Sequence, residues 1–225
     1  MPRTRCDCTV QSDSLGSLFE QMRGENMKVV AINHLTLDGV TQAPGRPDED
    51  TREGFQNGGW SVPYGDEVMG KFMGDRMVRG GALLLGRRTY EDLFGFWPNQ
   101  TENPFTDVLN NTTKYVASTT LRAPLAWSNS VLLAGDAAAA VAELKKRPGP
   151  DLAILGSASL VQSLMRHNLI DEYLLTIHPL VLGSGRRLFT DGCSPTPLEL
   201  VSTASTTTGV IIAIYRPADT QSPGS

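Results

Sequence analysis

The chain has 225 residues, of which 20 are Lys or Arg and 24 are Asp or Glu, so its formal net charge is -4. A protein that binds nucleic acid by neutralising phosphates is normally basic, and this acidic balance argues against such a partner. Hydrophobic residues make up 40% of the chain and charged residues 20%, which excludes wholesale disorder. No apolar run approaches the roughly 20 residues of a membrane-spanning helix, so we expect no membrane association.

The cysteines and the start of the chain bear on compartment and on metal binding. Cys6, Cys8 and Cys193 are too few for a disulfide framework in a chain of this size. The first residues carry charges and no apolar stretch, unlike a secretory signal. We therefore expect a cytoplasmic protein. Because Cys6 and Cys8 have no further ligands nearby in the sequence, we predict no metal site.

The chain divides into a central domain and two flanking segments. Residues 1–26 are weakly patterned, and we interpret them as a loose N-terminal extension. The first strand-like run begins at Met27, and apolar segments recur until about Tyr215, so we predict one domain over 27–215. Residues 216–225 are polar and contain Pro, Gly and Ser, which is typical of a flexible tail.

The first half of this domain is predicted to contain, in chain order, a strand at about 28–35, a loop at 40–65, a helix at 66–79, a strand at 82–86 and a helix at 104–111. Asp66 is suited to the N-cap of the first helix. The apolar run at 82–86 is typical of a strand that is covered on both faces. The second helix has Pro104 in its first turn, where proline is tolerated.

The second half is predicted to contain strands at 114–117 and 130–134, a helix at 136–147, a strand at 151–155, a helix from Ser159 and a strand at 172–182. The remainder, to about Tyr215, is predicted to form one or two antiparallel strands, the clearest at 210–214. Asp136 suits the N-cap of one helix, and Ser159 with Gln162 has the capping-box pattern at the start of the other. Alternating strands and helices indicate an α/β fold whose sheet is mostly parallel, with an antiparallel finish.

Polar or glycine-rich segments follow four of the predicted strands, where open α/β sheets bind their ligands. Residues 38–39 (DG) follow the first strand. Arg87 and Arg88 could grip a phosphate or be solvated surface charges. Residues 118–120 (STT) offer hydroxyl groups or form a plain loop. Residues 156–159 (GSAS) could present helix N-terminal N–H groups to a phosphate or form an ordinary turn and cap. The sequence has no G-x-G-x-x-G and no Walker motif.

Two stretches carry a family resemblance. Residues 86–91 (GRRTYE), followed by 97–98 (WP), resemble the GR-x-T-[WY]-E motif of the dihydrofolate reductase fold. The stretch 155–189 is similar to the riboflavin-biosynthesis reductase branch of that superfamily, which forms the C-terminal domain of the bifunctional deaminase-reductase and has stand-alone members. Residues 37–39 (LDG) fit the same branch. The resemblance spans about 27–215 and implies a central, mostly parallel eight-stranded sheet with antiparallel C-terminal strands and flanking helices, NADPH as cofactor, and a homodimer.

The resemblance also implies roles for single residues on the cofactor side. Arg87, Arg88 and Thr89 are expected to hold the adenosine phosphates, and Ser118 with Thr119 to lie under the adenine ribose and its 2′-phosphate. The pyrophosphate is expected at a helix N-terminus formed by Gly156, Ser157, Ala158, Ser159 and Leu160. An arginine beside a 2′-phosphate would favour NADPH over NADH.

On the substrate side, Asp38 is the candidate catalytic and substrate-binding residue, with a turn-forming Asp-Gly as the alternative. Thr176 matches the family threonine on the strand that lines the substrate. Trp60 and Phe72 are further candidates for substrate binding. The loop 40–65 is too long for a bare connector, and we predict a lid over the nicotinamide, with a disordered surface insertion as the alternative.

One feature departs from dihydrofolate reductases. Their first helix carries a carboxylate that binds the pteridine, and the matching position here falls near Gly70, which has no side chain. Asp66 and Glu67 lie one turn earlier. True dihydrofolate reduction is therefore disfavoured, and no proton donor can be named from the sequence.

The remaining candidates are two histidines and a basic turn. His34 could lie near the nicotinamide or be a packed strand histidine. His178 is predicted to be structural, since Pro179 ends the strand there. The turn from Gly183 to Arg187 could be a second phosphate grip, for instance for a ribose-phosphate substrate, or a glycine turn with surface arginines.

The sequence as a whole predicts an NADPH-dependent reductase that passes hydride to a pyrimidine-like, pterin-like or ribosyl-bearing small molecule, resembling the pyrimidine reductase of riboflavin biosynthesis. The H-x-E and P-C-x-x-C signature of a zinc deaminase is absent, so a stand-alone relative with a different substrate is equally compatible with these residues. A non-catalytic NADPH-binding module and a true dihydrofolate reductase are the competing hypotheses.

Overall fold

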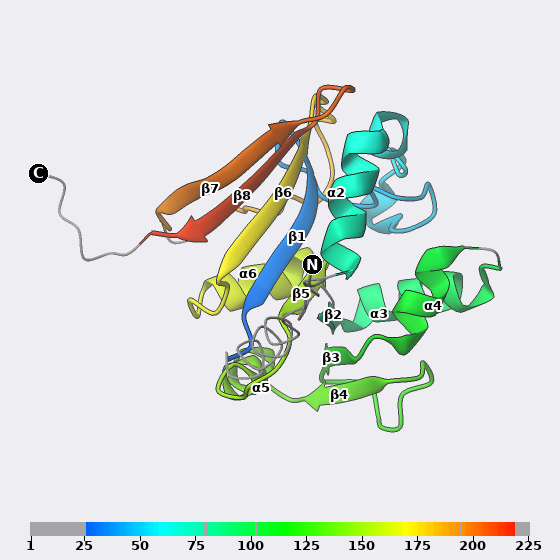
Figure 1. The fold of residues 1–225 in the computed structure, drawn as a ribbon, viewed down its shortest axis with the longest axis vertical. Coiled ribbons are helices and arrows are strands. Elements are labelled where there is room, and N and C mark those ends of the chain that lie inside the picture. The colour runs from blue at the N-terminus through cyan, green and yellow to red at the C-terminus, as the bar shows by residue number, and fades with distance from the viewer. Residues whose placement is uncertain (1–25, 79–80, 102, 194, 219–225) are drawn as a thin grey trace, which may run out of the picture.

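The computed structural model describes residues 26–78, 81–101, 103–193 and 195–218. Its centre is one eight-stranded sheet with the strand order β4-β3-β2-β5-β1-β6-β8-β7 (Figure 1). The strands are β1 (Val29–Thr36), β2 (Ala82–Gly86), β3 (Lys114–Ser118), β4 (Ser130–Ala134), β5 (Leu152–Leu155), β6 (Glu172–His178), β7 (Leu198–Ser205) and β8 (Ile211–Pro217). The pairs from β4 to β6 are parallel, whereas β8 is antiparallel to both of its neighbours. The predicted fold class is confirmed.

Five helices and three short 3-10 turns connect the strands. The helices are α2 (Glu67–Val78), α3 (Arg87–Phe96), α4 (Pro104–Asn111), α5 (Ala137–Leu144) and α6 (Ala158–Met165). The 3-10 turns are η1 (Arg52–Gly54), η2 (Val62–Tyr64) and η3 (Trp97–Asn99). Helix α3 was not predicted from the sequence, and the end of α5 was placed at Arg147, three residues beyond its last helical residue, Leu144.

The central strands of the sheet are buried on both faces because helices pack against each face. Ala31, Leu84 and Ile154 belong to the core cluster that includes α5 and α6. Leu174 and Ile212 pack with Met69 of α2 on the other face. Burial from both sides explains why the central strands read as continuous apolar runs instead of alternating ones.

The 40–65 segment is folded around a small core of its own. Val40, Ala43, Phe55 and Trp60 are buried together, and Leu180 and Leu182 pack against them. The Trp60 indole N–H donates a hydrogen bond to the Gln42 carbonyl at 2.8 Å. This segment is therefore an ordered part of the domain and not a disordered insertion.

Three further predicted boundaries were wrong. The strand expected over 172–182 ends at His178, because Pro179 cannot continue the ladder. The helix expected to begin at Ser159 starts at Ala158, with Ser157 at the N-cap. The tail expected over 216–225 begins later, since β8 continues to Pro217 and Arg216 pairs in register with Glu199 of β7. The predictions for 1–25 and 219–225 lie outside the described residues.

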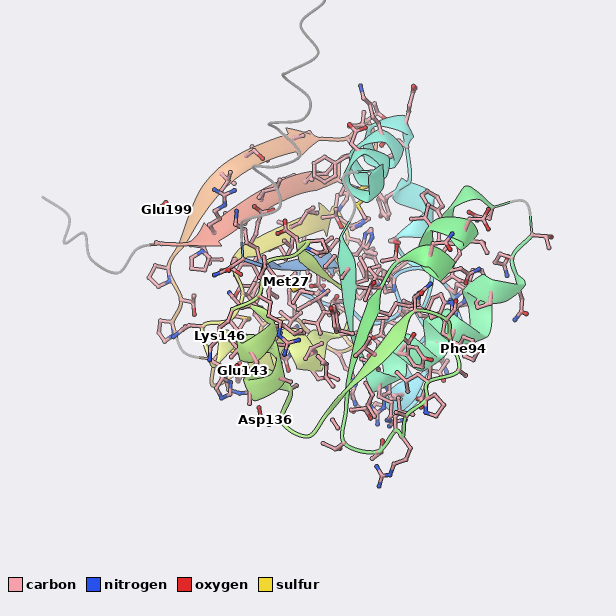
Figure 2. The ribbon with its side chains drawn as sticks, turned by 60° about the horizontal axis from the view of Figure 1, so that its bottom comes forward. Met27, Phe94, Asp136, Glu143, Lys146 and Glu199 are labelled. Carbon is pink, nitrogen blue, oxygen red and sulfur yellow. The ribbon has the colours of Figure 1, made fainter. Side chains whose placement is uncertain are left out.

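Figure 2 labels several exposed side chains, among them Asp136, Glu143, Lys146 and Glu199. Asp136 stands at the start of α5, where its carboxylate accepts the Ala139 N–H at 2.8 Å. Glu143 and Lys146 form an exposed ion pair at the other end of this helix. Glu199 marks the outermost strand, β7. No helix in the described ranges is both long and apolar enough to cross a membrane.

Candidate active site

A cleft of about 1120 Å³ runs along the carboxyl ends of the parallel strands. The ten residues predicted to bind the cofactor all line it: Arg87, Arg88, Thr89, Ser118, Thr119, Gly156, Ser157, Ala158, Ser159 and Leu160. They come from the N-termini of α3 and α6 and from the end of β3. The 40–65 segment, Ile32 and His34 of β1, and Met73 of α2 line the rest of the cleft. The fold thus brings together three segments that are far apart in sequence.

The two helices that begin at this cleft have no side-chain caps. Gly86 precedes α3 and Ser157 precedes α6, and neither makes a side-chain hydrogen bond to the first turn. The other three helices are capped, α2 by Asp66, α4 by Asn103 and α5 by Asp136. Because uncapped N-termini leave backbone N–H groups and positive helix-dipole ends exposed, both helices point anion-binding ends into the cleft.

Ser157 ties these two helix starts together. Its hydroxyl accepts the Gly86 N–H at 3.1 Å and donates to the Thr89 hydroxyl at 2.7 Å. Gly156 and Ser157 both have left-handed backbones, with φ of 62° and 49°. A left-handed conformation is uncommon for serine, and such strain concentrates at functional turns.

Two arginines lie at the start of α3 but differ in their contacts. The Arg87 guanidinium donates to Glu91 one turn later, at 2.7 Å. Arg88 is exposed and has no ion-pair partner among the described residues. Arg88 therefore carries the less compensated positive charge of the two.

The hydroxyl groups after β3 have different roles. The Ser118 side chain is buried, and its hydroxyl accepts the N–H groups of Thr120 and Leu121 at 3.1 and 3.0 Å. Ser118 thus fixes the turn, whereas Thr119 is exposed at the wall of the cleft.

Asp38 does not line the cleft. Its carboxylate accepts the Thr36 hydroxyl at 2.6 Å and the N–H groups of Leu182 and Gly183 at 3.2 and 2.9 Å. The Arg187 guanidinium lies 3.6 Å away. The hydrogen bond from Thr36, followed by those from the backbone, lowers the pKa of Asp38 from 3.8 to about 2. Asp38 therefore stays ionised at neutral pH. Its hydrogen bonds join the turn after β1 to Leu182 and Gly183, which follow β6 in the chain. This geometry does not support a role for Asp38 as proton donor.

The other three substrate-side candidates lie behind the cleft wall. Trp60 is buried in the core of the 40–65 segment, and Phe72 packs with Met69 of α2. Thr176 is buried on β6, where its hydroxyl lies 2.9 Å from Nδ1 of His34. None of the three is among the residues that line the cleft.

His34 combines both roles that the sequence left open for it. It is a half-buried histidine on the central strand β1, and it also lines the cleft. Burial, followed by the neighbouring His178, lowers the pKa of His34 from 6.5 to about 4. The imidazole is therefore neutral at physiological pH.

Four charged residues of the 40–65 segment line the cleft, and none of them was predicted from the sequence: Asp48, Glu49, Asp50 and Arg52. Two neighbouring charged residues fix the segment in place. Arg46 forms an ion pair with Asp92 of α3, and Glu53 forms one with Arg186 beyond β6. Glu49 accepts the N–H groups of Gly45 and Arg46, and desolvation is the main cause that raises its pKa. These two ion pairs fix the middle of the segment to α3 and to the residues that follow β6. The charge-rich run PDEDTRE at 47–53 was the available signal.

Comparison with known proteins identifies the family. The family described as the RibD C-terminal domain matches residues 27–212. The chain belongs to the RibD C-terminal domain family. This confirms the resemblance found in the sequence, and family membership indicates an oxidoreductase.

Individual relatives of this RibD C-terminal domain protein agree in sequence or in fold. The uncharacterized protein YyaP of Bacillus subtilis (strain 168) is 33% identical over 138 residues, which are 59% of this chain and 72% of YyaP. A pyrimidine reductase-like protein from Corynebacterium diphtheriae has a TM-score of 0.58 at 15% identity, covering 86% of this chain and 92% of that one. Dihydrofolate reductase from Enterococcus faecalis, solved with NADP(H), has a TM-score of 0.55 at 16% identity, covering 87% and 99%. At these identities the two structures establish the shared fold alone.

Proposed function

We propose that this RibD C-terminal domain protein is an NADPH-dependent reductase. It would transfer hydride to a pyrimidine-like, pterin-like or ribosyl-bearing small molecule, as the pyrimidine reductase of riboflavin biosynthesis does. The observation that carries the proposal is the pair of uncapped helix N-termini, α3 and α6, that face one cleft beside Arg87 and Arg88.

The residues of the cleft suit a dinucleotide phosphate. The pyrophosphate would accept hydrogen bonds from the N–H groups at the start of α6, where Gly156 has a φ of 62° and nothing lies within 4 Å of the place where a Cβ would stand. Arg88 would pair with the 2′-phosphate through charge-assisted hydrogen bonds. The cleft volume of about 1120 Å³ exceeds that of a typical drug-sized pocket. When bound, NADPH supplies the hydride, and the protein supplies binding, orientation and exclusion of water.

The wall formed by α2 argues against dihydrofolate as the substrate. Gly70 offers no carboxylate, and Met73 is the side chain of α2 that lines the cleft. Of the two acids one turn earlier, Asp66 caps α2 and accepts both the N–H and the hydroxyl of Thr207, so its carboxylate is engaged. Glu67 is exposed and is not among the residues that line the cleft. A protonated pteridine would find no counter-ion on this wall.

The same observations motivate the second candidate, a cofactor-binding module without catalysis. Helix α2 presents no carboxylate to the cleft, and the Asp38 carboxylate is held in a turn. Such a protein would have the cofactor site of a reductase without an evident proton donor. Turnover with any acceptor separates the two functions.

Cofactor binding and turnover test the proposal together. NADPH titration, followed by intrinsic tryptophan fluorescence, should show saturable binding that is tighter than binding of NADH. Oxidation of NADPH, followed at its nicotinamide absorbance, should depend on a pyrimidine or ribosylamino-pyrimidine acceptor. Binding without turnover on any pyrimidine or pterin would favour the module, turnover of dihydrofolate that antifolates inhibit would favour dihydrofolate reductase, and absence of NADPH binding would exclude all three.

A further inference from the structure

His34 is a polar side chain that lines the cleft, on the face of β1 that carries Ile32. Met73 of α2 lines the same cleft. One edge of the imidazole is engaged, because Nδ1 lies 3.0 Å from Nε2 of His178 and 2.9 Å from the Thr176 hydroxyl. The other ring nitrogen, Nε2, has no hydrogen-bond partner among the described residues.

The neighbours of Nδ1 determine which nitrogen of His34 carries the proton. Nδ1 of His178 is buried and has no partner, and a bare acceptor is tolerated there better than an N–H. His178 therefore carries its proton on Nε2 and donates it to His34. The hydrogen bond from His178 makes Nδ1 of His34 the acceptor, so the His34 proton resides on Nε2. The Thr176 hydroxyl lies 2.9 Å from the same nitrogen and donates to the Asn33 carbonyl at 3.4 Å.

The ring of His178 is held in place by the 40–65 segment. Trp60 and Tyr64 contact it edge-on, with ring centroids 5.1 and 5.5 Å away. Burial lowers the pKa of His178 to about 4, so neither histidine carries charge at neutral pH. Trp60 and Thr176 thus act on the cleft through the two histidines and do not line it themselves.

We infer that His34 is a catalytic residue of this reductase, and that its Nε2–H hydrogen-bonds the carbonyl oxygen or imine nitrogen of the substrate; this inference rests on the proposed function. As the C4–H bond of the nicotinamide breaks and a C–H bond forms on the substrate, the π electron pair moves onto that oxygen or nitrogen. The hydrogen bond from Nε2 strengthens as negative charge develops there. A proton from water then completes the alcohol or amine, and His34 keeps its own.

This arrangement narrows the substrate class. A neutral N–H donor matches an atom that gains negative charge, and it gives nothing to a cationic ring nitrogen. The cleft beside His34 therefore suits a carbonyl or imine compound better than a protonated pteridine, in agreement with the missing carboxylate on α2.

Nitrogen NMR of the whole protein, labelled with ¹⁵N-histidine, tests the tautomer directly. The chain has three histidines, and the third, His167, is exposed at the end of α6 and provides an internal reference. Near neutral pH, His34 and His178 should both be neutral with the proton on Nε2. His178→Phe should remove the donor and give His34 a measurable Nδ1–H population, whereas Thr176→Val, which leaves His178 in place, should keep the His34 proton on Nε2. A His34 that carries its proton on Nδ1 in the wild type would overturn the inference.

Ligand addition to the same sample tests the position of His34. NADP⁺ should shift the Nε2–H signal of His34, and 2′-phospho-adenosine diphosphate ribose, which is NADP⁺ without its nicotinamide, should leave that signal in place. If both ligands bind and His34 responds to neither or equally to both, the inference is wrong and the cofactor site stands. If neither ligand binds, the proposed function fails and the inference fails with it.

Discussion

Single residues decide the charge balance of the cleft, and Arg88 is the clearest case. Arg87 shares its charge with Glu91, while Arg88 has no ion-pair partner among the described residues. Both lie at the N-terminus of α3, where the helix dipole adds to their positive charge. The arginine with the free guanidinium should contribute more to binding the 2′-phosphate.

Arg88→Ala should therefore weaken NADPH binding while leaving NADH binding nearly unchanged. Loss of charge-assisted hydrogen bonds is worth about 1.5–3 kcal/mol, or roughly 10- to 100-fold in Kd. Arg87→Ala should have a smaller effect, and Arg122→Ala, an exposed arginine outside the cleft, should have none. Fluorescence titration with both cofactors measures the ratio. An equal loss of NADPH and NADH affinity would refute the assignment to the 2′-phosphate.

Asp38 gives a prediction about acid stability. Its folded-state pKa of about 2 lies below the ordinary 3.8, so its ionised form contributes stability at all pH values above about 4. That contribution is lost as the pH falls from about 4 to about 2. Asp38→Asn should lower stability at neutral pH by about 1–2 kcal/mol, because the Leu182 and Gly183 N–H groups lose a charged acceptor.

Urea unfolding at several pH values checks this. The stability gap between wild type and Asp38→Asn should be constant above about pH 4 and narrow below it. Asp191→Asn is the control, since Asp191 is exposed and has no partner in the described part of the chain. A gap that persists unchanged at pH 2 would contradict the role given to Asp38.

At the scale of elements, the C-terminus of α4 depends on a buried lysine. Lys114 has no exposed surface, and its Nζ donates to the carbonyls of Leu109, Asn110 and Thr112 while lying 4.5 Å from the centre of the Trp127 ring. Desolvation lowers the pKa of this amine to about 8. The Leu109 and Asn110 carbonyls are among those that a helix end leaves without intrahelical partners, and Thr112 is the C-cap residue.

Lys114→Met should therefore destabilise the protein, because it keeps the apolar stem and removes the shared donor. Loss of this donor at the Leu109 and Thr112 carbonyls should cost about 2 kcal/mol, or roughly 4–8 °C in Tm. The Asn110 carbonyl keeps Ser128 and Asn129 as donors. Lys146→Met removes a lysine from an exposed ion pair instead and should cost under about 0.5 kcal/mol. Thermal unfolding of the two variants compares them, and similar losses would show that the Lys114 hydrogen bonds add little.

The helices and strands also show what the sequence could reveal. Asp66 and Asp136 were predicted as N-caps, and both cap their helices in the structure. The prediction was possible because N-capping depends on a carboxylate that directly precedes the helix in the sequence. Ser159 was wrong as a cap because the left-handed turn at Gly156 and Ser157 starts α6 earlier than the capping-box pattern suggests. The start of α3 was taken for a phosphate-binding segment with no helix assigned, since its first residues are polar.

The candidate site also has one part that the sequence predicted and one part that it did not. Its cofactor half lies on segments that directly follow strands, so their sequence position alone predicted that they would meet. The contact between His34 and His178 depends on the register of β1 against β6. In that register Thr36 lies opposite His178, which is 142 positions later in the chain. No local pattern encodes that register, and the tautomer of His34 follows only from the buried atoms around it.

At the scale of the whole molecule, the β7 end of the sheet presents an apolar surface to solvent. Every residue of β7 after Leu198 is exposed, and Leu200 and Val201 retain 55% and 46% of their exposure beside a bulge. Two adjacent, exposed apolar side chains on an outer strand that no helix of the described residues covers are typical of an interface. We propose that a second copy of the chain packs there about a two-fold axis, so that the patch faces itself.

The chain should accordingly elute as a dimer in light-scattering chromatography, and Leu200→Lys with Val201→Glu should yield a monomer. Opposite new charges keep the net charge unchanged, so any dissociation reflects the lost apolar contact. Val131→Lys, at an exposed position on the opposite edge strand β4, is the matched control and should leave the dimer intact. Because the patch lies outside the residues that line the cleft, the monomer should keep NADPH affinity. A monomeric wild type, or a control that dissociates equally, would exclude this face as the interface.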